Sequence, residues 1–275
     1  MAAVVHRVFG GGGLELRVDE TGSPDGRPIL FIHGFSQCRL SWRRQFDATS
    51  PLAERFRLVA LDIRGHGGSA KPPDVYGESK LWADDVAAVI EQLGLDHPVL
   101  VGWSYGGVIM ADYLSIHGED AIAGTNWVGA VSKLGAPVMP FLDDRFVALV
   151  PGFYSTDAVE SAAALSAFMR LCVHDEPAPD DFFYALGYNT IVPSHVRRAL
   201  FARTLDHTET LGRLGRPALV THGADDAVVR PTSGEAIAAA IPNAQLSLYP
   251  GVGHAPFLEA PDRFNAELAD FVDRL

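Results

Sequence analysis

One serine of this sequence lies in a five-residue pattern that serves nucleophilic catalysis. Residues 102–106 read Gly-Trp-Ser-Tyr-Gly, which matches the pattern G-x-S-x-G around Ser104. A serine hydroxyl can attack a carbonyl carbon and carry the acyl group when a general base takes its proton. The two glycines fit a sharp turn that exposes the serine, because larger side chains there would collide with neighbouring backbone. The pattern therefore predicts a nucleophile at Ser104 and acyl-transfer chemistry.

The elements on either side of Ser104 fit such a turn. The apolar run 98–102 predicts a buried strand before the serine, and residues 105–116 predict a helix after it. This order places the serine at a helix N-terminus, where the backbone N–H of Tyr105 and the helix dipole can stabilise an oxyanion. We therefore expect Tyr105 to supply one oxyanion donor. Because the five-residue pattern can occur by chance, the prediction of a nucleophile depends on the strand before Ser104 and the helix after it.

Buried strands and helices alternate along most of the chain. The glycine run 10–13 joins two strands of a predicted hairpin, and no Lys-Ser/Thr follows it. It therefore reads as a flexible turn rather than a phosphate-binding loop. Further near-continuous apolar runs are typical of parallel strands that are covered on both faces. The remaining predicted strands are 4–9, 14–20, 28–32, 58–61, 124–131, 217–222 and 245–249, and the further helices are 79–93, 233–241 and 261–275.

The regular alternation stops between about residues 132 and 210. Prolines and aromatic residues are frequent there, and helical pieces such as 158–171 occur without buried strands. We therefore expect an α/β core formed by residues 1–131 and 211–275, with residues 132–210 forming a helical cap over the sheet. The aromatic side chains of this cap either line an apolar substrate pocket or pack the cap on the core, and the sequence leaves both interpretations open.

Composition narrows the range of partners. The chain has 275 residues, of which 48% are hydrophobic, and a formal net charge of -12. Such a charge argues against binding to nucleic acid or to an anionic membrane surface. No apolar run approaches the roughly 20 residues that span a bilayer, and two cysteines are too few for a disulfide framework. We expect a cytoplasmic protein that acts on a small molecule.

Five short motifs together resemble the α/β-hydrolase superfamily, in its branch with a serine nucleophile. The resemblance covers nearly all of the chain outside residues 132–210, and it implies a mostly parallel eight-stranded sheet flanked by helices, with a helical cap insertion. It also implies the chain order serine, acid, histidine. The motifs are His-Gly-Phe at 33–35, Asp-Ile-Arg-Gly-His-Gly-Gly-Ser at 62–69, the serine pattern at 102–106, Gly-Ala-Asp-Asp at 223–226 and Gly-His at 253–254.

The resemblance assigns the other two members of a catalytic triad. His254 follows the last predicted strand in a glycine-containing loop, where its imidazole can reach the serine turn and act as general base. An acid is expected after the strand 217–222 to orient that imidazole. The family spacing, three residues after Gly223, selects Asp226. Asp225 is then a solvated turn residue.

Other motif residues are given supporting or binding roles by the same resemblance. The second oxyanion donor is expected to be the backbone N–H of Phe35. We expect His33 to brace that loop and the turn at 62–67 to hold a buried polar network, so that His66 is not the base. Three aromatic residues are expected to contact the substrate: Trp103, Phe141 and Phe257.

The motifs leave the substrate open. The predicted function is hydrolysis of a small carboxylic ester or lactone, as in carboxylesterases and metal-free acylhomoserine lactone hydrolases. Ser104 argues against epoxide hydrolases and haloalkane dehalogenases, which resemble this scaffold but use aspartate, and neither His-x-His-x-Asp-His nor His-Glu-x-x-His occurs. We therefore expect no metal and no cofactor. The alternatives are a cofactor-free haloperoxidase or perhydrolase, a C–C bond hydrolase, and a non-catalytic ligand-binding member of the fold.

Overall fold

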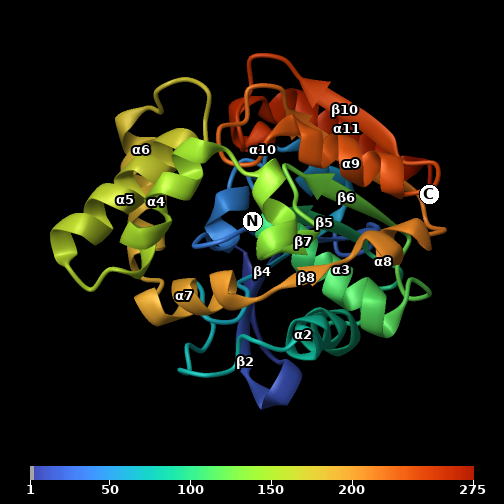
Figure 1. Cartoon of the computed structure of the whole chain (residues 1–275). Helices are drawn as coiled ribbons and strands as arrows, with labels where there is room; N and C mark the ends of the chain where they lie inside the picture. The colour runs from blue at the N-terminus through green and yellow to red at the C-terminus, as the bar shows by residue number, and fades with distance from the viewer. Residues whose placement is uncertain (1–2) are drawn as a thin grey trace.

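The computed structural model describes residues 3–275, and an eight-stranded sheet runs through its centre (Figure 1). The strand order is β1-β2-β4-β3-β5-β6-β9-β10. Strand β2 pairs antiparallel with β1 and β4, whereas the other neighbouring strands pair parallel, which confirms the predicted fold class. The strands are β1 (Val4–Phe9), β2 (Glu15–Gly22), β3 (Pro28–Ile32), β4 (Arg57–Leu61), β5 (Val99–Trp103), β6 (Gly124–Val128), β9 (Ala218–Gly223) and β10 (Gln245–Tyr249).

The central strands are buried along their whole length because both faces of the sheet are covered. Every residue of β3, β5 and β6 is buried. Successive side chains of a strand point to opposite faces. Leu30 and Leu100 accordingly belong to one apolar cluster, whereas Phe31 and Val101 belong to another on the opposite face. The sheet therefore has a hydrophobic layer on each side.

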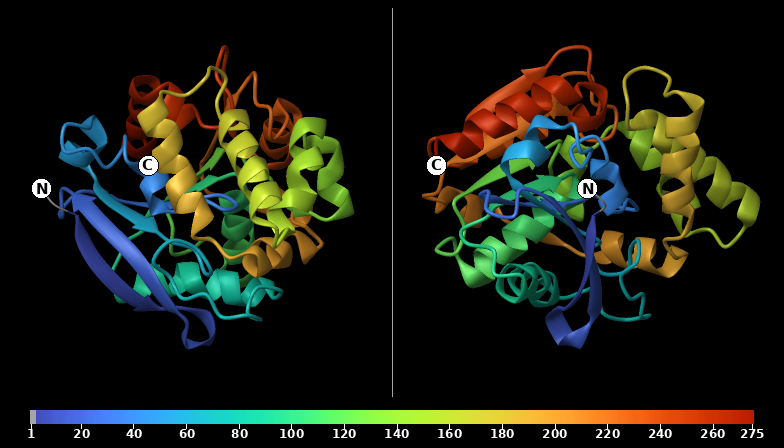
Figure 2. Two further views of the ribbon diagram at one scale, coloured as in Figure 1. Left: turned by 90° about the vertical axis from the view of Figure 1, so that its left-hand side faces the viewer. Right: turned by 180° about the vertical axis from the view of Figure 1, so that it is seen from behind.

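Helices complete these two layers (Figure 2). The first cluster includes side chains from α2, α3 and α9, and the second includes side chains from α1 and α11. Within residues 3–275, none of the helices combines the length and apolar character needed to cross a membrane. The helices are α1 (Pro51–Arg55), α2 (Ser79–Gln92), α3 (Tyr105–His117), α8 (Thr208–Gly212), α9 (Pro231–Ala240), α10 (Pro256–Glu259) and α11 (Pro261–Asp273), with 3-10 turns η1 (Gly11–Gly13), η2 (Arg39–Trp42) and η3 (Ala136–Phe141).

Four further helices lie together at one side of the sheet (Figure 1). They are α4 (Asp144–Tyr154), α5 (Ala158–Leu171), α6 (Pro179–Thr190) and α7 (Ser194–Ala202), and we call them the inserted helices. Two short strands, β7 (Lys133–Leu134) and β8 (Leu205–Asp206), pair antiparallel before and after them. The chain therefore leaves the core at β7 and returns to it at β8, next to the point where it left.

The glycine run between β1 and β2 is not the flexible turn that we expected. It forms η1, whose Gly11 N–H donates to the Asp85 carboxylate at 2.9 Å. The buried Arg64 guanidinium donates to the same carboxylate and to the Gly11 carbonyl oxygen. A Cβ on Gly11 would lie 2.6 Å from the backbone oxygen of Leu81. Gly11, and Gly10, whose Cβ would lie 2.2 Å from the Asp85 carboxylate, are therefore needed for close packing against α2.

Candidate active site

Ser104 lies at the junction of β5 and α3, in a backbone conformation that few residues adopt. Its φ is 55° and its ψ is -117°. Such a strained conformation persists where the surrounding structure fixes it. Here the Ser104 N–H donates to the Val128 carbonyl oxygen at 2.9 Å, and the Val131 N–H donates to the Ser104 carbonyl oxygen at 3.3 Å. The turn between strand and helix therefore holds the serine as a nucleophile elbow would require.

The glycines of the serine pattern provide the space for this turn. A Cβ on Gly106 would lie 2.2 Å from the backbone oxygen of Ile32, at the end of β3. A Cβ on Gly102 would lie 2.8 Å from the Gly106 carbonyl oxygen. Both distances are shorter than carbon–oxygen contacts allow, and the neighbouring atoms are backbone. The turn can therefore form only with glycine at these two positions.

Replacing Gly106 with alanine should destabilise the protein by about 2 kcal/mol, because the added methyl group forces β3 away from the turn. The free energy of unfolding in urea measures this effect. Gly77 is the matched control, since a Cβ there would meet no atom within 4 Å. The variant G77A should change the free energy by less than about 0.5 kcal/mol. Equal stabilities of the two variants would contradict this account of the turn.

Asp226 and His254 form a buried hydrogen-bonded pair. The His254 Nδ1 lies 2.7 Å from the Asp226 Oδ2, and their side chains are 1% and 0% exposed. The other carboxylate oxygen accepts hydrogen bonds from the backbone N–H groups of Val228 and Val229, at 2.8 and 2.9 Å. Asp226 follows β9 and His254 follows β10, whereas Ser104 follows β5. All three residues therefore lie at the edge where the parallel strands end.

Gly129 and Trp103 connect this pair to the serine turn. A Cβ on Gly129, the residue after β6, would lie 3.1 Å from His254 Nδ1 and 3.4 Å from Asp226 Oδ2. Trp103, which precedes the serine, donates from its indole N–H to the His254 carbonyl oxygen at 2.8 Å. The two rings also pack together, with centroids 5.4 Å apart. The serine, the histidine and the aspartate thus converge although the chain separates them widely.

The protein keeps the Asp226 carboxyl group ionised. Burial alone would raise its pKa, but the charge of His254 and hydrogen bonds from His222 and His254 hold the pKa well below the ordinary value. An ionised carboxylate accepts a hydrogen bond from the Nδ1–H group of His254, and the Nε2 lone pair of that ring stays free. Asp225 has a different place, because it is exposed and accepts the Gly251 N–H at 2.8 Å. The structure therefore brings Asp226, and not Asp225, to His254.

A second imidazole reaches the same carboxylate. His222, in β9, places its Nε2 3.1 Å from the Asp226 Oδ2, and its side chain is fully buried. His222 lies outside the five motifs that point to the site. The available signal was a histidine that ends a predicted buried strand four residues before the acid. Spacing alone could not show that both histidines share one oxygen.

The backbone N–H groups of Phe35 and Tyr105 both lie beside the serine. Tyr105 is the first residue of α3, and a Cβ on Gly34 would lie 2.9 Å from the Ser104 Cβ. Neither N–H donates a hydrogen bond to another group in the part of the chain that the structure describes. Two free donors beside a nucleophile are what an oxyanion requires.

Buried histidines brace the loop that carries Phe35. The next residue, Ser36, has a left-handed backbone with φ at 59°, and its N–H donates to the Nε2 of His66 at 3.2 Å. The Nε2 of His33 accepts the Ile63 N–H at 3.1 Å. Burial lowers the pKa of His33 to about 3 and that of His66 well below its ordinary value. Both rings are therefore neutral acceptors that hold backbone N–H groups.

Arg197, on the inserted helix α7, holds the same loop from the other side. Its Nε donates to the Ser36 hydroxyl at 3.0 Å, and its Nη2 donates to the Asn189 carbonyl oxygen at 2.6 Å. The residue is 2% exposed, and no carboxylate lies within 4.0 Å of it among residues 3–275. Burial lowers its pKa to about 10, so the guanidinium stays charged at neutral pH. An unpaired buried cation therefore ties the inserted helices to the Phe35 loop.

The variant R197M should lower kcat roughly tenfold and leave KM within about twofold, because a displaced oxyanion donor acts mainly on the transition state. Ser36 would lose one of the two contacts that hold its left-handed backbone. Stability should change by less than about 1 kcal/mol, since methionine removes an unpaired buried charge. Steady-state kinetics and urea unfolding test this. The neighbouring variant R198M, at an exposed position, is the control. Equal kinetics in both variants would contradict the assigned role.

A small apolar cavity adjoins the serine. It measures about 50 Å³ and lies between the core and the inserted helices. Phe146 of α4 and Phe201 of α7 form its outer wall, whereas Val131 and Val228 belong to the core. The lining residues are Phe35, Ser104, Tyr105, Val131, Leu134, Gly135, Val138, Leu142, Phe146, Phe201, Val228 and Val229.

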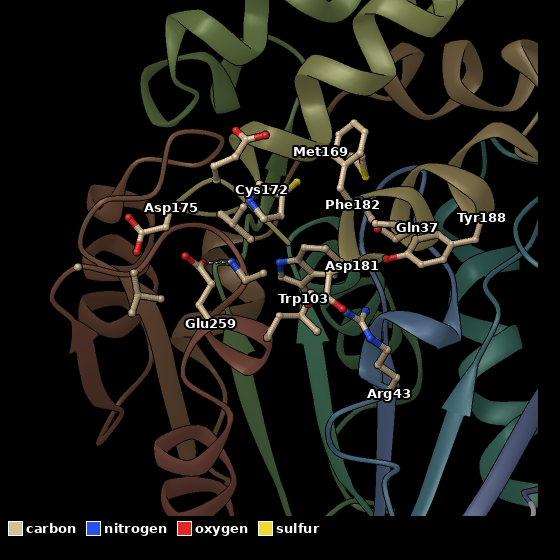
Figure 3. A pocket seen from close by; sticks show the side chains of 18 residues that line it. Gln37, Arg43, Trp103, Met169, Cys172, Asp175, Asp181, Phe182, Tyr188 and Glu259 are labelled. Atoms are coloured by element: carbon tan, nitrogen blue, oxygen red, sulfur yellow. Dashed lines mark hydrogen bonds and ion pairs between the residues drawn. The ribbon is translucent and has the colours of Figure 1, made fainter. Parts of the chain in front are cut away.

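A larger and more polar cavity of about 250 Å³ lies beyond Trp103 (Figure 3). Its walls carry Gln37 and Arg43 from the core and Asp181 and Tyr188 from α6. Arg43 and Asp181 form an ion pair at 2.5 Å. Ser104 does not line this cavity. Among residues 3–275, no three His, Cys, Asp or Glu side chains are placed to hold a metal ion.

The three aromatic residues expected to contact the substrate lie in different places. Trp103 lines the larger cavity, and Phe141 lines a separate cavity of about 100 Å³ with Val138. Phe257 is fully buried and packs against Trp42 and Trp103 in the core. It lines neither the cavity at Ser104 nor the larger one.

Comparison with known proteins identifies the family. A sequence profile of the α/β hydrolase fold matches residues 27–261. The chain belongs to the α/β-hydrolase family. A non-heme haloperoxidase of Rhodococcus erythropolis is 31% identical over 95% of this chain and 97% of its own length. A bifunctional esterase/perhydrolase of Acinetobacter calcoaceticus is 30% identical over 94% of this chain and 96% of its own.

Solved structures of α/β-hydrolases superpose closely on this one. The crystal structure of the esterase RhEst1 from Rhodococcus sp. has a TM-score of 0.91 and 35% sequence identity, and 98% of each chain is covered. The serine turn, the Asp226–His254 pair and the helices inserted between β6 and β9 all lie within the residues that match the family, 27–261.

Proposed function

We propose that this protein is a serine hydrolase that cleaves a small carboxylic ester or lactone through an acyl-enzyme. Ser104 is the nucleophile, His254 is the general base and Asp226 orients that base. The observation that carries the proposal is the 2.7 Å hydrogen bond between His254 and Asp226 beside a serine on a strained turn. The esterases among its relatives and structural neighbours support the same chemistry.

Each step of the reaction has a group to perform it. The Nε2 of His254 takes the proton of the Ser104 hydroxyl as the oxygen attacks the ester carbonyl carbon. The resulting oxyanion accepts hydrogen bonds from the free N–H groups of Phe35 and Tyr105, which form the oxyanion hole. His254 then protonates the leaving alcohol, and the acyl group remains on Ser104. Water repeats the sequence and releases the acid.

The cavity at Ser104 favours an apolar acyl group of modest size. Its volume of about 50 Å³ and its Phe, Val and Leu lining match a short aliphatic group. Phe146 and Phe201 close it from the inserted helices, which therefore act as a cap that sets substrate size. An anionic acyl group would find no cationic side chain in this lining. The substrate class is thus a neutral ester of a small apolar acid.

A second activity on the same residues is perhydrolysis. The relatives named above include a non-heme haloperoxidase and a bifunctional esterase/perhydrolase. Here hydrogen peroxide replaces water as the nucleophile that attacks the acyl-enzyme, the peracid leaves, and the proton returns to Ser104 through His254. This reaction needs the same triad and no added cofactor.

A fluorophosphonate probe tests the proposed function directly. The probe should label Ser104 of the wild-type protein and should not label S104A. Absence of labelling under conditions that label a control esterase would refute hydrolysis and favour a ligand-binding member of the family. A panel of p-nitrophenyl esters of increasing acyl length, acyl homoserine lactones, and peracid formation from acetate and peroxide then separates the activities. We expect the highest rates with short acyl groups.

A further inference from the structure

The contacts of His222 fix where its proton lies. Its Nε2 is 2.9 Å from the Val229 carbonyl oxygen and 3.1 Å from the Asp226 carboxylate oxygen. Both neighbours are acceptors, because the carbonyl oxygen cannot donate and the Asp226 carboxylate is ionised. The Nε2 must therefore carry hydrogen and donate. This N–H donates to the Val229 carbonyl oxygen and lies 3.1 Å from the Asp226 Oδ2, the oxygen that also faces His254.

This N–H group completes the surroundings of the Asp226 carboxylate. Oδ1 accepts two backbone N–H groups, and Oδ2 accepts the Nδ1–H of His254 and lies 3.1 Å from the Nε2–H of His222. An ionised carboxylate offers about four acceptor sites, and four N–H groups therefore face it. A proton transferred to Asp226 would displace one of these donors. The proton that His254 takes from the serine therefore stays on His254.

The Nδ1 of His222 indicates that this side chain does more than fill space in the core. Nδ1 has no hydrogen-bond partner within residues 3–275, although the side chain is fully buried. A buried polar atom without a partner destabilises a fold, and an apolar side chain would avoid that penalty. Space is also reserved for the ring, because a Cβ on Gly234 of α9 would lie 2.6 Å from Nδ1. The donor at Nε2 is what distinguishes histidine here.

We propose that His222 is a positioning residue of the active site, which holds the Asp226 carboxylate in place and moderates the negative charge that His254 meets. The proposal rests on the proposed function, in which His254 is the base. With its N–H group 3.1 Å from Oδ2, His222 offsets part of the negative charge that faces His254. Removal of His222 should therefore favour the protonated form of His254.

Two other titratable groups face Asp226. Cys172 follows α5 and Glu259 ends α10. Burial is the main cause that raises the pKa of each, and the charge of Asp226 adds to it. Glu259 accepts the N–H groups of His174 and Gly253. Neither side chain hydrogen-bonds the Asp226 carboxylate in the described part of the chain. A shift in the pH profile on removal of His222 is therefore attributable to the shared oxygen.

The variants H222L and H222Q separate donation from packing. Leucine removes the donor, whereas the glutamine amide nitrogen can occupy the place of Nε2. For H222L we expect kcat on p-nitrophenyl acetate to fall about tenfold near pH 7 with KM within twofold, as for a lost positioning contact. In the plot of kcat/KM against pH, the acidic limb should move up by roughly half to one pH unit, because the Asp226 carboxylate without His222 beside it favours protonated His254. H222Q should keep the wild-type limb and lose less than about threefold in kcat.

Gly234 offers a second test that leaves His222 unchanged. The variant G234A should displace the His222 ring and so break its 3.1 Å contact with Asp226. The acidic limb of the pH profile should then move in the same direction as in H222L, with no further movement in the H222L background. An unchanged limb in H222L, or equal losses in H222L and H222Q, would overturn the proposal. An NMR titration of His254 in wild type and H222L reports the same shift without turnover. It therefore tests His222 even if fluorophosphonate labelling refutes the hydrolase.

Discussion

Replacing Ser104 with alanine should lower kcat/KM on p-nitrophenyl acetate by about 10³-fold or more, the loss seen when a catalytic nucleophile is removed. Alanine lacks the oxygen that forms the acyl-enzyme, so only the oxyanion donors and substrate binding would remain. The backbone hydrogen bonds at Val128 and Val131 do not involve the hydroxyl, and the turn should persist. Kinetics and urea unfolding measure the two effects separately.

A serine far from the turn provides the control for this experiment. Ser247 lies in β10, where its hydroxyl donates to Glu267. The variant S247A should retain activity within about twofold, because it touches neither the triad nor the cavity. The unfolding free energy of S104A should stay within about 0.5 kcal/mol of the wild type. A residual rate in S104A above a few per cent of the wild-type rate would refute the assignment of the nucleophile.

Replacing Asp226 with asparagine should lower kcat by about 10⁴-fold, because the amide favours the wrong tautomer of the catalytic histidine. Asparagine has one acceptor oxygen where the carboxylate accepts from two backbone N–H groups and from His254 Nδ1. Its NH₂ group would either face those N–H groups or face His254 Nδ1. In the second case the proton moves to Nε2, and the base is lost.

Asp225 is the matched control, since the same substitution one residue earlier changes only a loop contact. Its carboxylate is exposed and accepts the Gly251 N–H. The variant D225N should keep kcat within about threefold of the wild type. Similar losses in both variants, or a larger loss in D225N, would show that the wrong carboxylate was assigned. Measurements of kcat with p-nitrophenyl acetate at saturating concentration decide between them.

The sheet could be predicted because its strands are buried on both faces. Runs such as 28–32 and 98–102 are apolar throughout, and they appear as β3 and within β5. One predicted strand was too long, since 124–131 was expected and β6 ends at Val128. The chain turns at Gly129, whose φ is 47°. The side chains of His254 and Asp226 lie against this glycine. Hydropathy could not anticipate that the active site ends this strand.

The contacts around the site were less accessible from the sequence. The choice of Asp226 over Asp225 came from family spacing, and the structure supplies its geometric reason at His254. Arg197 was not singled out, because a lone arginine in a helical segment usually reads as a solvated residue. Its contact with Ser36 joins positions far apart in the chain, which no local pattern encodes. The glycine run 10–13 was read as flexible for the same reason, since its partners Asp85 and Arg64 are distant.

The pairing of β7 with β8 separates the part of the chain that carries the proposed triad from the part that lines the apolar cavity. Leu134 and Leu205 meet across that pair, so the intervening residues form a closed excursion from the core. A loop whose ends are already joined can change length or sequence with little effect on the rest of the chain. The core carries Ser104, Asp226 and His254, whereas the excursion carries Phe146 and Phe201 of the apolar cavity. Substrate range can therefore diverge by changes in this segment that keep the Arg197 contact with Ser36, while Ser104, Asp226 and His254 stay in the core.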